Sequence, residues 1–346
     1  MASKGIYIYG IVPNFYGTDH FRSLEKSGVY AISHQNISAI VSDRETAYLD
    51  YLDRESLAHV LVHHQKTIEE LMAKGFNMIL PMKLGTIVHS KEEVLNILAT
   101  GYNLMILSLK KIEYLTEIDM AVTWADFPKT LQEIADNPEI TELKNQLLQS
   151  GTALTQVDQV KVGMLLKEKL DDRNKSVELK ILEAFSSISV DIKIHEVMND
   201  QMITNSAVLI KRNNTASFEQ AIEILDEEYR GALNFKLVGP LPCYSFYTLE
   251  VKELNPEKVE KARKEFGLTE KTTEHEIKKA YLEKAKLYHP DNNQQTDDTT
   301  NFNMLKSAYQ TLVDYSSAAR QSGKEDFISL AKEKVVENLI LVKIKD

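Results

Sequence analysis

The chain has few of the residues that build covalent or metal-bound frameworks. Its 346 residues include one cysteine, Cys243, which excludes an intramolecular disulfide and any multi-cysteine metal site. No apolar run approaches the roughly 20 residues that a membrane span requires, and the start, MASKGIYIYG, lacks the layout of a secretory signal. These absences predict a protein of the reducing cytoplasm with no membrane partner.

An excess of positive charge is also missing. The net charge is −10, and segments 256–323 and 324–346 are each balanced, so the whole acidic excess lies in residues 1–255. Because affinity for phosphate backbones needs clustered Lys and Arg, nucleic acid is not an expected partner. Hydrophobic and charged fractions of 43% and 27% are near globular averages, and the length predicts two or three domains.

Residues 1–118 carry the pattern of a compact α+β domain. GIYIYGIV alternates β-branched and aromatic residues before Pro13, which indicates a strand, and Ser90 followed by Glu93 indicates a capped helix start. The predicted elements are strands at 5–12, 29–33, 37–42 and 78–82, the middle two forming a hairpin, and helices at 53–74 and 90–116.

Residues 119–255 repeat the cycle of strand, helices and strands. Ser217 with Gln220 predicts a helix that ends at Gly231. The other predicted elements are strands at 120–125, 188–196, 206–212, 233–239 and 244–252 and helices between 126 and 187. Two α+β units in series follow from this order, and one long sheet is the alternative.

A change to polar, lysine-rich helical segments near Asn255-Pro256 marks the next boundary. Helices are predicted at 258–266, 273–288 and 301–315, the second capped by Thr273 with Glu276. A further helix should lead from 324 to a final strand at 338–345, which we expect to complete the second α+β sheet. The resulting division is 1–118, 119–255, 256–323 and 324–346.

The third segment resembles the J domain of Hsp40-type cochaperones over nearly its full length. The matching residues are Gly267-Leu268, Ile277-Lys278-Lys279-Ala280-Tyr281, Tyr288-His289-Pro290-Asp291, Phe302 and Ala308-Tyr309. The resemblance implies a small all-α domain in which His289, Pro290 and Asp291 form a docking loop for Hsp70. Lys278 and Lys279 would belong to the basic face that steers the partner.

Several positions depart from this J-domain pattern. The departures are Leu282, Glu283, Leu287 and Asn292, where the family is commonly basic, and Lys284 and Lys286, where it is commonly hydrophobic. Glu274, Glu276 and Glu283 dilute the positive field of the helix. Activation of an Hsp70 and retention as a helical module for other contacts are therefore both open.

The larger part of the chain resembles gas vesicle accessory proteins of the F/L family. The resemblance is carried by YIYGIV with Tyr7, Tyr9 and Gly10, by SAIVS (38–42), by His64 and ILPMKLGT with Pro81, Lys83 and Gly85, and by GPLPCYSF with Gly239, Pro240, Tyr244 and Phe246. Lys83, Leu84, Leu241 and Cys243 depart from the usual residues. The resemblance implies two α+β units, the first ferredoxin-like, whose motif residues serve structure or a partner surface.

This resemblance implies a role in building gas vesicles, which are gas-filled shells of a small, very hydrophobic subunit. An acidic, soluble carrier with exposed sheet edges or apolar patches would keep such a subunit from aggregating. The expected partners are the shell protein, other accessory proteins and an Hsp70, and the expected location is the gas vesicle in the cytoplasm. A general J-domain cochaperone with an N-terminal client-binding body is the alternative.

No pattern for catalysis, a cofactor or a metal site is evident, so we expect a protein that is not an enzyme. His59 and His63 have helical i, i+4 spacing with His64 beside them, but no acidic partner of the HExxH type accompanies them. Cys243 is expected to be a buried small hydrophobe. The aromatic residues Tyr7, Tyr9, Phe246 and Tyr247 suit a core or a subunit contact better than a ligand box.

Overall fold

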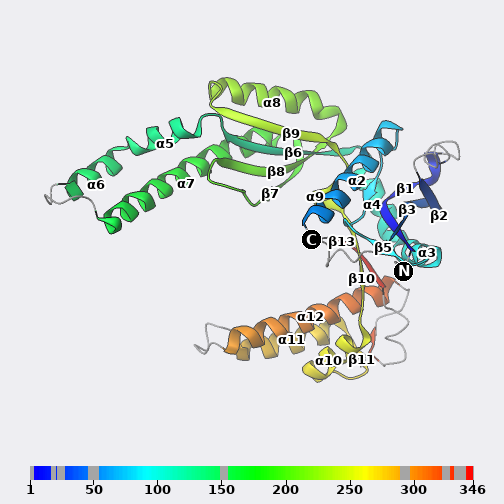
Figure 1. The fold of residues 1–346 in the computed structure, drawn as a ribbon. Coiled ribbons are helices and arrows are strands. Elements are labelled where there is room, and N and C mark those ends of the chain that lie inside the picture. The colour runs from blue at the N-terminus through cyan, green and yellow to red at the C-terminus, as the bar shows by residue number, and fades with distance from the viewer. Residues whose placement is uncertain are drawn as a thin grey trace. The chain divides into compact units, whose positions relative to one another are not determined.

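The computed structural model describes residues 4–16, 21, 28–45, 54–148, 155–288, 297–321, 328–330 and 340–345 (Figure 1). Their contacts divide the chain into two compact units. The first consists of Met1–Lys111 with Tyr247–Asp346, and the second is Ile112–Phe246. Both units mix helices and sheets, which confirms the predicted α+β class. The first unit also contains the C-terminal helices, although they are far from the N-terminal sheet in sequence.

An antiparallel sheet forms the N-terminal part of the first unit. The strand order is β2-β3-β1-β4, and β5 also pairs with β1. The bounds are β1 (Lys4–Pro13), β2 (Val29–His34), β3 (Ile37–Glu45), β4 (Leu80–Pro81) and β5 (Ile87–Val88), with a 3-10 turn η1 (Asn14–Tyr16) after β1. The β2–β3 ladder confirms the predicted hairpin, whose turn places Gln35 at φ 51°.

Three helices follow in this part of the chain: α2 (Arg54–Ala73), α3 (Lys91–Thr100) and α4 (Tyr102–Ile112). Ser90 Oγ accepts a hydrogen bond from the Glu93 amide at 3.2 Å, so the predicted cap is confirmed. The predicted single helix over 90–116 is wrong, because α3 ends at Thr100 and α4 begins two residues later.

Gly101 separates these helices at a point where strand β13 (Ile340–Ile344) approaches closely. A Cβ atom added to Gly101 would lie 2.8 Å from Val342 Cγ1 and 2.9 Å from Met105 Cε. Only glycine leaves room for this contact. The break therefore depends on a residue more than 200 positions away, which local spacing does not reveal.

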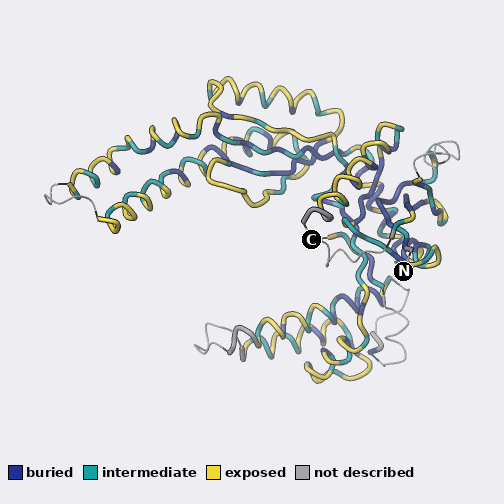
Figure 2. The backbone as a smooth tube through the Cα atoms, viewed as in Figure 1, coloured by how far each residue is buried: buried dark blue, intermediate teal, exposed yellow. Residues whose placement is uncertain are grey.

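The second unit is built on an antiparallel sheet with the strand order β7-β8-β6-β9. Its strands are β6 (Leu115–Trp124), β7 (Ser189–His195), β8 (Met202–Lys211) and β9 (Leu233–Leu241), and its helices are α5 (Phe127–Ala135), α6 (Pro138–Leu148), α7 (Gln156–Ser186) and α8 (Thr215–Glu228), with a 3-10 turn η3 (Arg212–Asn214). Both α7 and α8 pack on one core with Trp124, Phe185 and Phe218. Figure 2 shows the buried strands of this sheet in dark blue.

Two local predictions for this unit are wrong. Helix α8 begins at Thr215 rather than Ser217, and its N-cap Asn214 donates its side-chain amide to the Ile188 carbonyl at 3.2 Å instead of capping the helix. The strand predicted over 244–252 is a one-turn helix, α9 (Tyr244–Tyr247), followed by strand β10 (Leu249–Glu253).

Three helices of the first unit correspond to the predicted helical module: α10 (Pro256–Phe266), α11 (Glu274–Tyr288) and α12 (Asp297–Gln321). The Thr273 hydroxyl accepts from the Glu276 amide at 3.2 Å, and the Glu276 carboxylate accepts from the Thr273 amide at 2.8 Å, which confirms the capping pair. A short ladder joins β11 (Lys271–Thr272) to β12 (Ile328–Ser329). The helix predicted from 324 falls largely outside the described residues.

The terminal strand pairs with part of the strand predicted over 244–252, but the two form a sheet of their own, so the predicted sheet is wrong. Strand β13 pairs antiparallel with β10, from Leu249 opposite Ile344 to Glu253 opposite Ile340, and does not join the sheet of the second unit. Leu341 lies in the core of the helical module, and Val342 lies against Gly101. The two faces of β13 are therefore both buried where it pairs with β10, which favours this position over the edge of the second unit's sheet. The other proposed domain limits stay predictions.

We expect Gly101→Ala to destabilise the protein by about 1–3 kcal/mol, because the new methyl group must displace Val342. The matched control is Gly163→Ala in α7, where an added Cβ meets no atom within 4 Å. That change should stabilise the helix by about 0.5–1 kcal/mol. Urea unfolding followed by circular dichroism measures both, and equal effects would contradict the close contact.

Candidate functional site

Two tyrosines of β1 hold the N-terminal sheet against α2 and the loop after β4. Tyr7 Oη lies 2.9 Å from His64 Nδ1 and accepts from the Gly85 amide at 3.1 Å, and Tyr9 Oη lies 2.9 Å from Ser42 Oγ. Burial raises the pKa of Tyr7 to about 12 and lowers the pKa of His64 to about 4. Both groups are therefore neutral near pH 7, and this cluster is part of the core.

Helix α2 does not bring its three histidines to one surface. His59 and His63 are exposed, whereas His64 is buried. His63 Nδ1 lies 3.3 Å from Thr67 Oγ1. Within the described ranges, no group of three or more His, Cys, Asp or Glu side chains is placed to hold a metal ion. Likewise, none of the described helices is both long and apolar enough to span a bilayer.

The loop KLGT after β4 joins the N-terminal sheet to β10. The Lys83 amide donates to the Leu249 carbonyl at 2.8 Å, and Lys83 Nζ lies 2.5 Å from Glu250 Oε1. Gly85 has φ 83°, a left-handed conformation that favours glycine. This loop therefore connects the family-motif residues of the sheet with the strand that leads into the helical module.

Gly10 allows β1 and β4 to approach each other closely beside this loop. It pairs with Pro81 across β1 and β4, and a Cβ atom at Gly10 would lie 2.9 Å from Ile79 Cγ2 and 3.0 Å from the Leu80 carbonyl oxygen. Tyr7, Tyr9, Gly10, Pro81, Lys83 and Gly85 are thus neighbours in one part of the first unit. Of these, Lys83 has the exposure that a partner contact requires, with 48% of its side chain accessible.

The helical module is fixed to the same junction by side chains as well as by strands. Lys252 of β10 forms an ion pair with Asp314 of α12, whose side chain is 4% exposed. Gln321 at the end of α12 binds both backbone groups of Val342 in β13. Leu254 and Leu341 belong to the module's core. The module is therefore joined to β10 and β13 by side-chain contacts as well as by its core.

Helix α11 presents Lys278 and Lys279 to solvent, and neither forms an ion pair with a described residue. Lys284, by contrast, pairs with Glu265 of α10 at 3.1 Å. The acidic residues that the sequence places on this helix are partly engaged, because Glu274 pairs with Arg320 at 2.5 Å and Glu276 caps the helix start. His289, Pro290 and Asp291 lie outside the described residues.

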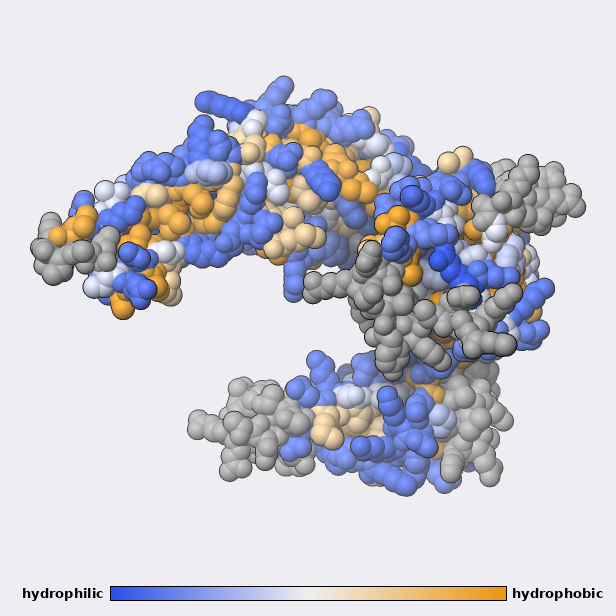
Figure 3. Space-filling model, viewed as in Figure 1, coloured by the Kyte–Doolittle hydropathy of each residue, from blue (hydrophilic) through white to orange (hydrophobic). Residues whose placement is uncertain are grey.

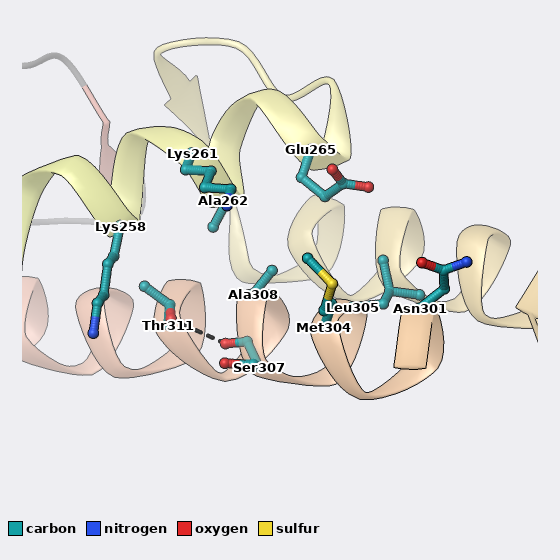
Figure 4. Close-up of a pocket in the computed structure, with 10 residues that line it drawn as sticks. All are labelled: Lys258, Lys261, Ala262, Glu265, Asn301, Met304, Leu305, Ser307, Ala308 and Thr311. Atoms are coloured by element: carbon teal, nitrogen blue, oxygen red, sulfur yellow. Dashed lines mark hydrogen bonds between the residues drawn. The ribbon is translucent and has the colours of Figure 1, made fainter. Parts of the chain in front are cut away.

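A groove lies between α10 and α12 of this module (Figure 4). It encloses about 340 Å³, and small side chains such as Ala262 and Ala308 leave this space. Lys258 and Lys261 stand on its α10 side, and Met304 is 57% exposed on its α12 side. Tyr281 and Tyr309 stack at 4.2 Å where α11 meets α12.

In the second unit, the segment GPLPCYSF is held by a buried carboxylate. Ser245 donates its amide to Glu117 Oε2 and its hydroxyl to Glu117 Oε1, both at 2.8 Å, and this contact forms the helical turn α9. A Cβ atom added to Gly239 would lie 3.0 Å from the Glu117 carbonyl oxygen. The Gly239-Pro240 peptide bond is cis. Phe246 is buried under the Lys193 ammonium, 5.7 Å from its ring centroid.

This cluster contains titratable groups that no sequence motif brings together. Burial raises the pKa of Glu117 to about 7 despite the two hydrogen bonds from Ser245, and burial also raises the pKa of Asp119. The Cys243 thiol has its pKa raised to about 12 by burial, so it stays protonated. His195 Nε2 lies 3.4 Å from Ser245 Oγ, whose proton goes to Glu117. The arrangement fixes α9 rather than activating a nucleophile.

Exposed apolar side chains form a stripe on the arm of the second unit. We call this set, on α6 and the first half of α7, the arm stripe; its members are Leu148, Val157, Val160 and Met164, with exposed fractions of 55% to 69%. Orange side chains gather over this arm in Figure 3. The other face of α7 packs Val162, Leu165 and Leu166 against α5 and α6, so helix stability does not require the arm stripe.

Comparison with known proteins separates the chain into two parts. Residues 5–248 match the family model described as gas vesicle synthesis protein GvpL/GvpF, and residues 250–320 match the DnaJ domain model. Both resemblances in the sequence are thereby confirmed.

Three curated relatives illustrate this division. Gas vesicle protein F of Nostoc sp. is 25% identical over 248 residues, which cover 70% of this chain and 98% of that protein. The protein of the same name from Dolichospermum flosaquae is 24% identical over 71% of this chain and 98% of its own length. The mitochondrial DnaJ homolog 1 of Saccharomyces cerevisiae is 39% identical over 87 residues, or 25% of this chain and 17% of that protein.

Solved structures agree with the fold. The crystal structure of the gas vesicle protein GvpF from Anabaena sp. has a TM-score of 0.55 at 24% identity and covers 70% of this chain and 98% of that one. The GvpF structure from Microcystis aeruginosa has a TM-score of 0.50 at 21% identity and covers 67% and 94%.

Glu117→Gln should remove a pH dependence of the second unit. The folded pKa of about 7 lies above the ordinary 4.5, so the folded state holds a proton that the unfolded state releases, and stability falls as pH rises from 4.5 to 7. The loss should be roughly 3 kcal/mol. Urea unfolding at pH 5 and pH 8, followed by fluorescence of the single tryptophan, Trp124, reports this unit.

The glutamine keeps an acceptor for Ser245 and carries no charge. Glu183→Gln on the exposed side of α7 is the matched control and should keep the wild-type slope. An unchanged slope in Glu117→Gln would contradict a neutral Glu117.

Proposed function

The chain belongs to the GvpL/GvpF family of gas vesicle synthesis proteins and carries a C-terminal DnaJ domain, and from this premise we propose that it is a gas vesicle assembly factor or minor vesicle-associated protein. Its body binds the hydrophobic shell subunit or other accessory proteins, and its helical module recruits an Hsp70. It would act at the gas vesicle within the cytoplasm.

The arm stripe carries the first half of this proposal. Four large apolar side chains more than half exposed on one arm lose contact with water when a partner covers them, which favours an apolar partner. Acidic residues outnumber basic ones in the chain by ten, so the complex would stay soluble through charge. The gas vesicle relationship of the body supports this function over a general cochaperone.

The geometry of the module supports the second half. Lys278 and Lys279 are exposed on α11, and the anchoring contacts of Lys252 and Gln321 give that helix a fixed position relative to β10 and β13. A fixed basic helix attracts an acidic surface and orients the encounter. A bound client and a recruited Hsp70 would then be held on one chain.

Met164→Lys and Val160→Lys should each weaken retention of purified shell subunit by about tenfold, because a charge in the apolar contact must be desolvated. Gln159→Lys, an exposed position next to the arm stripe, is the matched control and should bind as the wild type does. A pull-down with the full chain measures retention. If retention falls equally in all three variants, or in none, the shell subunit binds elsewhere on the chain. If the wild type does not retain the shell subunit, the proposal that this subunit is the client is wrong.

Lys278→Glu with Lys279→Glu should reduce stimulation of the cognate Hsp70 ATPase by about an order of magnitude at low salt, because the attraction that steers docking is reversed. The difference in ATPase stimulation between this variant and the wild type should become smaller as added salt screens the charges. The matched control makes the same charge change at Lys258 and Lys261 on α10, both exposed.

His289→Gln is the reference variant in which the proposed docking loop should no longer stimulate the Hsp70. If both charge-reversed pairs behave alike, or if His289→Gln stimulates as well as wild type, the module has a structural role and does not recruit Hsp70.

A further inference from the structure

Strand β7 lies at one edge of the sheet in the second unit. It pairs with β8 on one side and with no described strand on the other. The order β7-β8-β6-β9 leaves β7 and β9 as the two edges. An edge strand presents unpaired amides and carbonyls to any extended chain. Strand β9 carries Pro240, which has no amide to donate, whereas β7 contains no proline. The β7 edge is therefore the more open of the two.

The outward-facing backbone of β7 can be identified. The Ile192 amide donates to the carboxylate of Asp191 at 2.9 Å, so it is not used in the ladder with β8. In antiparallel pairing, the amide and carbonyl of one residue face the same side, and successive residues alternate. The backbone groups of Ile192 and Ile194 consequently face the open side.

The side chains of β7 sort onto the two faces of the sheet. Ile192 lies opposite Val208 and packs against the core under α7 and α8, and Ile194 follows it on that face with 52% of its surface exposed. Asp191 and Lys193 lie on the opposite face. Neither of these two forms an ion pair with a residue that the structure describes, although Lys193 covers the ring of Phe246.

The segment VDIKI (190–194) is complementary to itself when two copies run antiparallel. With Ile192 opposite its own copy, Val190 faces Ile194, and Asp191 faces Lys193, each pair occurring twice. Ile192 and Ile194 lie on the helix-covered face and the ion pairs on the other, and Val190 lies at the register shift between Ser189 and Asp191. Centring the pairing on residue 193 instead would also join outward backbone groups, but it would set two lysines against each other, which is unfavourable.

We propose that two copies of this protein associate through β7 as a symmetric antiparallel pair, which joins two sheets into one of eight strands. On pairing, the Asp191 carboxylate exchanges the Ile192 amide for Lys193 of the second copy, and the outward amide and carbonyl of Ile192 supply the central hydrogen bonds. The exposed Val190 and Ile194 bury each other. A two-fold contact of this kind uses the same patch on both copies. The inference is independent of the client and of Hsp70.

Charge reversal tests the proposal. Sedimentation velocity on the full chain, from about 1 to 100 μM because a one-strand interface is small, should show a monomer–dimer equilibrium. Lys193→Asp should raise the dimer dissociation constant at least about tenfold, since two attractive pairs become repulsive. Adding Asp191→Lys to that variant should restore the dimer, because opposite charges face each other again. Lys236→Asp on the β9 edge makes the same charge change and should leave the dimer intact.

Cysteine cross-linking checks the register. Under mild oxidation, Ile192→Cys should form a dimeric disulfide, because facing residues of a hydrogen-bonded pair lie about 5.5 Å apart at Cα. Ile194→Cys should not, because its own copy is displaced along the strand. Trp124 fluorescence shows whether each variant is folded. A monomeric wild type, or a double charge variant that fails to restore the dimer, would overturn the proposal and leave the edge to another extended chain.

Discussion

The pairing of β10 with β13 is the contact on which the arrangement of the first unit depends. Five facing residue pairs join the two strands, Met82 bridges to Leu249 beside them, and Leu254 and Leu341 continue into the core of the helical module. The same strand β13 covers Gly101 between α3 and α4. One short ladder therefore joins the strand that follows the gas vesicle family segment to the core of the DnaJ domain.

The family-motif loop of the first unit contacts this ladder, and the family-motif segment of the second unit precedes β10 in the chain. Lys83 and Gly85 belong to the loop that bonds Leu249 and Tyr7, and Ser245 is fixed by Glu117 just before β10 begins. Their contacts are hydrogen bonds to backbone and buried core groups rather than a set of converging reactive side chains. Apart from the exposed Lys83, the shared motif residues thus stabilise the fold, and the exposed apolar and charged side chains described above lie on α7 and α11.

Sequence reasoning succeeded where the cause of the structure is local. The caps at Ser90 and Thr273, the β2–β3 hairpin and the three helices of the module each follow from residues within a few positions. It failed where a distant residue decides. The split at Gly101 depends on Val342, and α9 forms because Ser245 meets Glu117, 128 positions away. The exposed arm stripe has helical spacing in the sequence, but periodicity alone does not tell an outward face from an inward one.

The position of β13 in the chain has a consequence for synthesis. Translation produces the N-terminal sheet and β10 first, then the helices of the module, and only then β13. Because domains fold as they emerge, the DnaJ helices can assemble while β10 still lacks its partner strand. During that interval the contacts of the module with β10 are limited to those of Lys252 and Leu254. The contacts of β13 with β10, Gly101 and the core of the module can form only after the rest of the described chain has been made, so this part of the structure is completed last.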